Sequence, residues 1–435
     1  MTPRSAEDSL SRLPPPPPPP PPSSSSARRT VFQMPVFNNI EDVDMYRPGG
    51  HHPVNLGDVV GHKFKIINKL GNGGFALVWL ARDLDQHGYV ALKILKADAQ
   101  DREIKVLRHL RKAARNVRIT NLHETFLIHG PNGAHQCLVL DLGGPSLKLL
   151  SLYCKRPPLP FLKAATRKLA EGVAALHLAG VCHGGKCCSP GFYRTPSTNQ
   201  NVDLTHSNVL FEITGLHDWT EDEIYRYLGP PKTAALLLLD GTPAPAFAPT
   251  HVVDAIDFSH LNMEQLSSNV LIVDFGEAFF QDNVPKGLGT PVSFSGPELL
   301  FGYSPSYTVD LWALGCLIFE IYTFRVLLPT AFGSSEEALA MAIETIGALP
   351  EEWRDSYYDK NKPLEVNPGK KHRWFDDQIQ RARTLDSQIL EQLPGLSQDQ
   401  HATLLQLLKS ILVFEPCHRL PAAEVGKHPW FTCES

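Results

Sequence analysis

The chain has 435 residues, of which 43% are hydrophobic and 20% charged, and a formal net charge of −5. Such a chain can form one large two-lobed unit or two ordinary domains, and its charge gives no reason to expect direct nucleic-acid or membrane-surface binding. Eight cysteines without a CxxC pair favour a reducing compartment. No apolar run approaches the ~20 residues of a membrane span and no apolar signal segment opens the chain, which predicts a soluble intracellular protein.

The N-terminal segment is rich in proline and serine. Nine consecutive prolines, Pro14 to Pro22, are followed by four serines. Such a segment favours polyproline II and cannot build a core, so we expect residues 1–45 to be a disordered tail. A tail without a dedicated partner is the favoured interpretation, and docking of an SH3- or WW-type partner is the alternative.

Folded sequence is expected from about Tyr46. Short strand-like runs alternate with Gly-rich or polar turns, and later segments carry helical apolar spacing. Strands are expected at 63–70, 76–83, 89–95 and 135–142, and helices at 102–113, 162–180, 309–324, 336–347 and 399–414. A small β-rich front followed by a larger helical back predicts an α+β fold with two lobes and a cleft between them.

The first informative motif joins two expected strands and reads Gly71-Asn72-Gly73-Gly74-Phe75-Ala76-Leu77-Val78. Glycines let such a turn bring backbone N–H groups close to phosphates, although a structural hairpin explains the motif equally well when it is taken alone. The next strand ends in Lys93, which after a glycine loop can hold phosphate oxygens. Glu103, which opens the following helix, is the expected carboxylate partner of Lys93.

Several further motifs follow in order. Asp274, in Val273-Asp274-Phe275-Gly276, ends an apolar strand, where a carboxylate can ligate Mg²⁺ that bridges nucleotide phosphates. Downstream come Gly296-Pro297-Glu298, Asp310-Leu311-Trp312-Ala313-Leu314-Gly315 and Arg419. Singly, each motif fits a turn, a helix cap or a surface charge. Their shared order along the chain is hard to produce by accident.

Together these motifs resemble the eukaryotic protein-kinase domain. Within it, Gly49-Gly50-His51-His52-Pro53-Val54 and ALAMAIETIGALPEEW at 338–353 look like the SR-protein kinases and their fungal relatives, in the group that also holds MAP and cyclin-dependent kinases. The resemblance spans about Tyr46 to Phe431. It implies a bilobal fold with an N-lobe at 46–142, a C-lobe at 143–435 and a lobe insertion at about 212–269.

The resemblance also implies a function: ATP- and Mg²⁺-dependent phosphorylation of Ser or Thr in proteins, with Arg-Ser-rich substrates expected, by a monomer of the cytoplasm, the nucleus or both. Lys93, paired with Glu103, would hold the α- and β-phosphates. Asp203 would accept the hydrogen bond of the substrate hydroxyl, and Asn208 and Asp274 would bind Mg²⁺. The nucleotide would lie against Leu70, Gly71, Asn72, Gly73, Gly74, Phe75, Val78, Ala91, Leu140, Asp141 and Leu142.

The same resemblance makes Glu298 and Arg419 a structural lock and Asp310 a brace of the catalytic loop. Two positions depart from the family pattern. Gly184 stands where many kinases have an arginine that contacts a phosphorylated activation segment, so we expect activity that does not depend on such phosphorylation. Thr205 replaces the usual lysine. Either Thr290 or Ser293 would face the acceptor.

The catalytic loop is interrupted after Gly184 by the eighteen residues 185–202. One interpretation is a retained intron: eighteen codons keep the reading frame, codons 185–187 can contain GTAAGT, codons 198–199 CTAAC, and codons 202–203 an AG acceptor that spans their boundary. Excision would restore His-Gly-Asp-Leu-Thr-His-Ser-Asn. The alternative is that residues 185–202 are a genuine insertion in the protein. In that case the split catalytic loop would make the chain a catalytically impaired scaffold rather than an enzyme. The restored loop also resembles small-molecule kinases, but Gly-Pro-Glu, the Asp310 helix and Arg419 favour a protein kinase.

Overall fold

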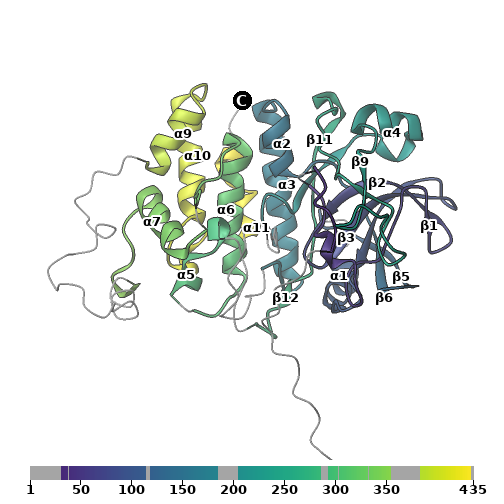
Figure 1. Cartoon of the computed structure of the whole chain (residues 1–435). Coiled ribbons are helices and arrows are strands. Elements are labelled where there is room, and N and C mark those ends of the chain that lie inside the picture. The colour runs from purple at the N-terminus through teal and green to yellow at the C-terminus, as the bar shows by residue number, and fades with distance from the viewer. Residues whose placement is uncertain are drawn as a thin grey trace, which may run out of the picture.

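The computed structural model describes residues 31–37, 39–113, 118–184, 204–285, 292–301, 303–331, 333–353 and 383–432. Within these ranges, a β-rich N-terminal lobe and a larger helical C-terminal lobe lie side by side (Figure 1). This is the two-lobed α+β fold that the sequence predicts. The insert 185–202, Asp203, Thr290 and the proline run of the tail lie outside the described residues.

The N-terminal lobe is built on a six-stranded sheet whose neighbours are all antiparallel, in the order β1-β2-β3-β4-β6-β5. Its strands are β1 Val59–Val60, β2 Phe64–Asn72, β3 Ala76–Asp83, β4 Tyr89–Leu95, β5 Leu122–Gly130 and β6 Gly133–Leu140. The runs 76–83 and 89–95 are confirmed as strands with the predicted bounds. Strand β6 ends earlier than expected, at Leu140, and β5 was not predicted.

The sheet buries both of its faces. Along β3, Leu80 joins the main core of the molecule, whereas Trp79 joins a second apolar cluster on the opposite face. The main core lies beneath helix α1 (Arg102–Ala113), which presents Ile104, Leu107 and Leu110 to it at helical spacing. This helix has the bounds expected from the sequence, and it places Glu103 in its first turn.

The C-terminal lobe is mainly helical. Its helices are α2 Leu147–Tyr153, α3 Leu159–Leu178, α4 Glu221–Leu228, α5 Pro297–Leu300, α6 Thr308–Thr323, α7 Ser335–Ile346, α9 Leu385–Gln392, α10 Gln398–Ile411 and α11 Ala422–Val425. Every residue of α6 is buried, so this helix forms the centre of the lobe. Short strands pair next to α3: β7 Val181–Cys182 with β12 Phe279–Phe280, and β8 Val209–Ile213 with β11 Leu266–Ile272.

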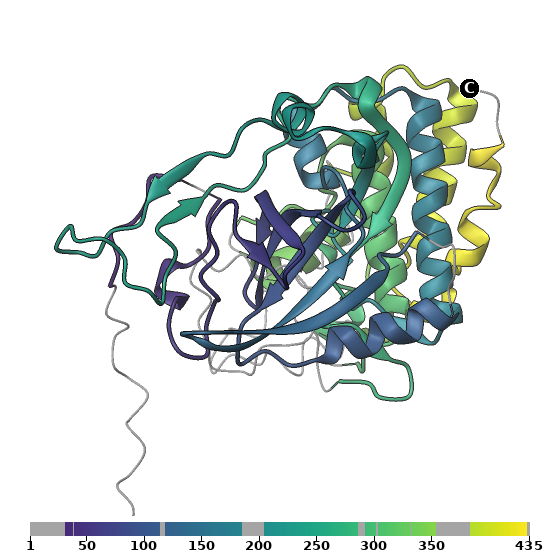
Figure 2. The same ribbon diagram turned by 90° about the vertical axis from the view of Figure 1, so that its right-hand side faces the viewer.

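The second apolar cluster shows where the lobe insertion lies. The middle of the insertion forms a ribbon of β9 (Thr233–Ala235) and β10 (His251–Val253), and this ribbon covers the outer face of the N-terminal sheet (Figure 2). Described residues upstream of Tyr46 lie there too: Phe32 is buried and bridges to Leu238. Folded structure therefore begins upstream of the boundary expected at Tyr46.

No helix in the described ranges is long and apolar enough to cross a lipid bilayer.

Candidate active site

Lys93, near the end of β4, lies between two carboxylates. Its Nζ is 2.7 Å from Glu103 Oε2 and 2.8 Å from Asp274 Oδ1. The ion pair expected between Lys93 and Glu103 is therefore present, and Asp274 joins it from 181 positions away in the chain. The side chains of Lys93 and Glu103 are buried, whereas that of Asp274 is 30% exposed. Asp274 is thus the member of this group whose carboxylate solvent can reach.

The charges in this group depend on one another. Burial alone would lower the pKa of Lys93, but the carboxylates of Asp274 and Glu103 outweigh it and raise that pKa. Burial would likewise raise the pKa of Asp274, yet the Lys93 ammonium group lowers it. At neutral pH the site therefore holds a fixed ammonium group beside an ionised and accessible carboxylate.

Asp274 follows β11 in a strained conformation. Its φ is 66°, in the left-handed region that residues other than glycine rarely adopt. The next residue, Phe275, is fully buried, and its backbone N–H donates to Glu103 Oε1 at 3.3 Å. Strain of this kind persists only where the surroundings enforce it. Here the Phe275 anchor and the Lys93 ion pair hold the carboxylate at the mouth of the site.

His183 connects the start of the catalytic loop to the strand that precedes Asp274. Burial lowers the pKa of His183, so its ring is neutral, and Nε2 donates to the carbonyl oxygen of Val273 at 3.0 Å. The ring also lies against Phe275, with centroids 4.8 Å apart. Asp310 accepts the backbone N–H groups of His183 and Gly184 at 2.9 and 3.1 Å. The brace expected of Asp310 is thus visible at this end of the loop.

The other described end of the loop runs from Leu204 to Asn208. Asn208 is buried; its N–H donates to the Thr205 carbonyl, and its own carbonyl accepts the N–H of Val273, each at 3.0 Å. Because Val209 pairs with Ile272 in the ribbon of β8 and β11, Asn208 and Asp274 lie at the same end of that ribbon. An amide oxygen and a carboxylate there are ligands that Mg²⁺ accepts beside phosphate oxygens.

The glycine-rich turn connects β2 and β3. Gly71 pairs with Val78, and the N–H of Gly73 donates to the Ala76 carbonyl at 3.0 Å. A Cβ added at Gly71 would meet no atom within 4 Å. The packing of this chain therefore does not require glycine there, whereas close approach of a ligand to the backbone would. Phe75, at the tip, is 48% exposed.

The wall expected to hold the adenine combines residues of four strands, β2, β3, β4 and β6. Leu70 and Val78 pack against the main core, and Ala91 is the direct partner of Leu140. Asp141 follows Leu140, and its carboxylate accepts Asn121 N–H at 2.8 Å and contacts His123 Nε2 at 2.6 Å. Burial would raise the pKa of Asp141, but these hydrogen bonds lower it. The Asp141 side chain is thus bound to β5 and its neighbouring turn. Leu142 is buried beside it.

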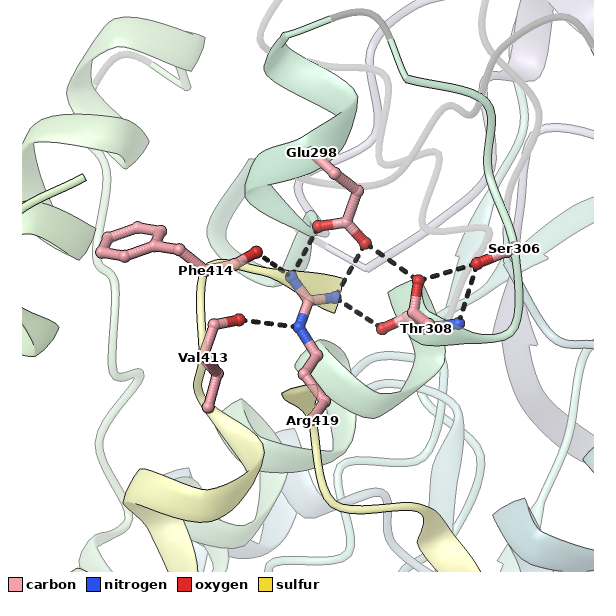
Figure 3. A network of polar contacts seen from close by, with 6 residues as sticks. All are labelled: Glu298, Ser306, Thr308, Val413, Phe414 and Arg419. Carbon is pink, nitrogen blue, oxygen red and sulfur yellow. Dashed lines mark hydrogen bonds and ion pairs between the residues drawn. The ribbon is translucent and has the colours of Figure 1, made fainter. Parts of the chain in front are cut away.

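Behind the site, Glu298 and Arg419 form the expected lock (Figure 3). Arg419 also donates to the carbonyl oxygens of Thr308, Val413 and Phe414, at 2.7, 2.8 and 3.1 Å. The Thr308 hydroxyl completes the network by donating to Glu298 Oε1 at 3.3 Å. This network connects α5, the start of α6 and the segment after α10.

One pair was missed by the sequence reasoning. His206 Nδ1 lies 2.8 Å from Oε1 of Glu320, a buried acid of α6. The sequence did carry a signal, because Glu320 follows nine residues without a charge and a buried carboxylate needs a partner. That the partner is a histidine of the catalytic loop requires the fold.

Comparisons with known proteins find similarity to protein kinases. The protein kinase domain family profile matches residues 261–431. Serine/threonine protein kinase AFUB_078980 of Aspergillus fumigatus is 27% identical over 407 residues, covering 91% of each chain. Serine/threonine-protein kinase SRPK of Physarum polycephalum is 27% identical over 422 residues, covering 90% of this chain and 91% of its own.

Two further comparisons concern a dual specificity kinase and a solved kinase structure. Dual specificity protein kinase CLK1 of Homo sapiens is 26% identical over 399 residues, covering 88% of this chain and 68% of its own. The crystal structure of the PF14_0431 kinase domain superposes with a TM-score of 0.57 at 20% identity, covering 88% of this chain and 98% of that one. At this identity the structural likeness shows the fold alone.

Proposed function

We propose that this chain, whose residues 261–431 match the protein kinase domain, transfers the γ-phosphate of ATP to Ser or Thr of protein substrates, as an SR-protein-kinase-like enzyme. The observation that carries the proposal is Lys93, held between Glu103 and Asp274 at 2.7 and 2.8 Å. An ammonium group that fixes an accessible carboxylate suits phosphate and metal binding better than a purely structural role.

The residues present fit ATP and Mg²⁺. Asn208 and Asp274 would hold the metal, Lys93 the α- and β-phosphates, and the turn Gly71–Phe75 would lie over the phosphates. Leu70, Val78, Ala91 and the segment Leu140-Asp141-Leu142 would contact the adenine. When bound, ATP would supply the phosphoryl group, and Mg²⁺ would neutralise part of the charge of its phosphates.

The groups of the chain would then position and deprotonate the substrate. Asp203 would accept the proton of the Ser or Thr hydroxyl. His183, anchored to Val273 and through its backbone to Asp310, would fix the start of the loop that carries Asp203. Glu103 would keep the Lys93 ammonium group in place. Catalysis would thus rest on positioning and charge.

We further propose that activity does not require phosphorylation of the activation segment. Gly184 offers no side chain to bind a phosphate. The start of helix α1 is held by other charges: Arg102 Nη1 lies 3.5 Å from Oε2 of Glu277, three residues after Asp274, and Glu103 pairs with Lys93. These contacts support an arrangement of α1 that is complete without a phosphate.

The finer assignments stay proposals. The N-lobe would comprise 46–142 together with the upstream segment from Val31, and the C-lobe 143–435. Arg-Ser-rich substrates, a monomeric state and a place in the cytoplasm or nucleus follow from the likeness to SR-protein kinases. The proline run, outside the described residues, would be either an inert tail or a ligand of an SH3- or WW-type domain.

A second function is favoured by one observation, the separation of Gly184 from Asp203 by residues 185–202. If those residues are present in the mature protein and displace Asp203, the chain would bind nucleotide without turnover and serve as a scaffold. Sequencing of the mature transcript decides whether 185–202 are removed: a message that contains only the long form would overturn the retained-intron interpretation.

The test compares the long chain with a form that lacks 185–202. Each form, and the Asp203→Asn variant of each, is assayed for Mg²⁺-dependent ATP binding by calorimetry and for phosphorylation of Ser, Thr and Arg-Ser-repeat peptides. We expect turnover in the short form that Asp203→Asn abolishes while ATP still binds. Binding without turnover in both forms would replace the enzyme by the scaffold, and equal turnover by wild type and Asp203→Asn would remove Asp203 from the mechanism.

A further inference from the structure

Residues 230–259, here called the strap, leave the C-terminal lobe and return to it at neighbouring points. A Cβ added at Gly229 would lie 3.1 Å from Cδ2 of His260, so the two ends of the strap are in contact. Between them, β9 and β10 form a two-stranded ribbon, which the Lys232 carbonyl closes by accepting the N–H of Asp254 at 2.9 Å. Because Gly229 and His260 already lie in contact, the chain of the C-terminal lobe could continue from one to the other without the strap.

The strap lies against the outer face of the N-terminal sheet. Leu236, Val252 and Val253 are all at least 98% buried, in the same apolar cluster as Phe64 and Trp79 of the sheet. Figure 2 shows the strap running along these strands, with the N-terminal segment beside it. Burial of this apolar surface stabilises the contact, but it does not by itself explain the polar bonds at one end of β2.

Those polar bonds converge on Lys69, whose side chain is completely buried. Its Nζ pairs with Glu41 of the N-terminal segment and donates to the carbonyl oxygen of Val253 in the strap at 3.2 Å. Its backbone carbonyl accepts the N–H of Ile256, also in the strap, at 2.9 Å. Tyr46 donates its hydroxyl to Glu41 at 2.5 Å. A buried lysine is costly unless it is paired, so this residue fixes the strap and Glu41 at one place.

A second connection lies three residues further along β2. The backbone carbonyl of Asn39 accepts two hydrogen bonds, from the N–H of Ala255 in the strap at 3.2 Å and from Nδ2 of Asn72 at 3.1 Å. Asn72 is part of the glycine-rich turn. The strap therefore holds β2 at Lys69 and, through Asn39, at Asn72, immediately beside Gly71.

We propose that the strap positions the glycine-rich turn, with Lys69 as the positioning residue, and that it thereby sets the affinity for ATP. The inference rests on the nucleotide site of the proposed function. No atom lies within 4 Å of a Cβ added at Gly71, and Phe75 at the tip of the turn is 48% exposed. The β3 side of the turn is held by Lys96, whose backbone N–H donates to the Phe75 carbonyl at 2.9 Å, and the strap holds the β2 side.

The test uses Lys69→Met in the full chain, with Lys65→Met as the matched control. Lys65 lies on the same strand and also contacts the insertion, through Glu221 of α4 at 3.0 Å, but at the end of β2 far from the turn. Both variants are measured by hydrogen exchange of the amides at 70–75 and by calorimetric titration with ATP and Mg²⁺. We expect faster exchange and a dissociation constant raised at least about fivefold in Lys69→Met, and neither effect in Lys65→Met.

Lys69→Met leaves Glu41 buried without its cation and can fail to fold. The variant Lys69→Met/Glu41→Gln removes that charge and keeps an acceptor for the Tyr46 hydroxyl, while the bond to Val253 remains absent. We expect it to retain the faster exchange and the weaker ATP binding. Exchange at 70–75 equal to wild type in a folded Lys69 variant would overturn the strap's role. If the wild-type protein binds no ATP, the proposed nucleotide site is wrong. Hydrogen exchange at 70–75 still tests, independently of ATP, whether the strap positions the turn.

Discussion

Arg419 donates two hydrogen bonds of 2.7 Å to the two carboxylate oxygens of Glu298, which lies 121 positions earlier in the chain (Figure 3). The guanidinium group is also 5.1 Å from the ring of Trp312. Both side chains are almost completely buried, so each neutralises a charge that would otherwise be costly. This pair ties the segment after α10 to α5.

Arg419→Met should therefore destabilise the fold strongly. It leaves the Glu298 carboxylate buried and unpaired, which costs about 3–5 kcal/mol of unfolding free energy. Urea denaturation measures the loss. Arg167→Met is the control, because Arg167 pairs with Glu171 on the exposed face of α3 and such pairs contribute little. Equal stabilities of the two variants would contradict the structural role of the Glu298 pair.

Lys93→Met should affect both stability and nucleotide binding. It leaves Glu103 and Asp274 without their cation, so we expect a loss on the order of 3 kcal/mol at neutral pH. The lowered pKa of Asp274 in wild type stabilises the fold above the ordinary carboxyl pKa, and this contribution disappears as pH falls through the lowered value. The difference between variant and wild type should accordingly narrow towards pH 3.

Denaturation of both proteins at several pH values checks this dependence, and calorimetry checks the expected loss of ATP binding. Lys105→Met removes an exposed ion pair between Lys105 of helix α1 and Asp101, which precedes that helix, and this variant should behave as wild type in both measurements. A Lys93→Met variant whose stability deficit grows as the pH falls would contradict the charge arrangement.

Acid should weaken the N-terminal lobe through His51 and His52. Burial, with Lys96 and Lys69 nearby, lowers the pKa of His51 to about 3, and burial beside His135 lowers that of His52 to about 4. The unfolded chain takes up protons below pH ~6.5, whereas the folded lobe does not until far lower pH. The contribution of neutral His51 and His52 to the unfolding free energy is therefore fully present above pH ~6.5 and is lost as the pH drops towards 4.

The His51→Asn variant should show a flatter fall between pH 6.5 and 4 than wild type, measured as unfolding free energy against pH. His87→Asn is the control: this exposed residue has a φ of 58°, which asparagine tolerates, and its replacement should leave the slope unchanged. A His51→Asn slope as steep as that of wild type would show that His51 does not carry the acid sensitivity.

His206→Ala should destabilise the catalytic loop through Glu320. The buried carboxylate loses its 2.8 Å partner, and no other side chain among the described residues bonds its second oxygen. We expect a loss of about 1–3 kcal/mol in urea denaturation. The double variant His206→Ala/Glu320→Leu removes the unpaired charge and should recover much of that loss. A double variant no more stable than His206→Ala would place the effect elsewhere.

Local patterns were enough to predict several elements and contacts. The strands at 76–83 and 89–95 and the helix at 102–113 have the expected bounds, because turn residues and apolar spacing mark both of their ends. Motif order was also enough to bring Lys93, Glu103 and Asp274 to one site, since each lies at the end of a regular element. The catalytic roles of these residues remain predictions.

The strap could not be predicted in the same way. Leu236, Val252 and Val253 show no period, and the face that buries them is formed by residues more than 150 positions earlier, such as Phe64 and Trp79. The burial of Lys69 could not be predicted either, because a lysine in an apolar strand usually marks a solvated edge. Its partner Glu41 lies in a segment that composition assigned to the tail. Only tertiary contact reveals such residues.

The strap places a contact between the lobes on the outer face of the N-terminal sheet, in addition to the segment after β6 that joins them along the chain. The pairs of Lys65 with Glu221 and of Glu103 with the Phe275 N–H join the lobes at other places. A body attached at one point can turn about three axes, whereas attachment at several separated points removes most of that freedom. Twisting of one lobe against the other is therefore resisted from the outer face of the sheet as well as from the side of Lys93.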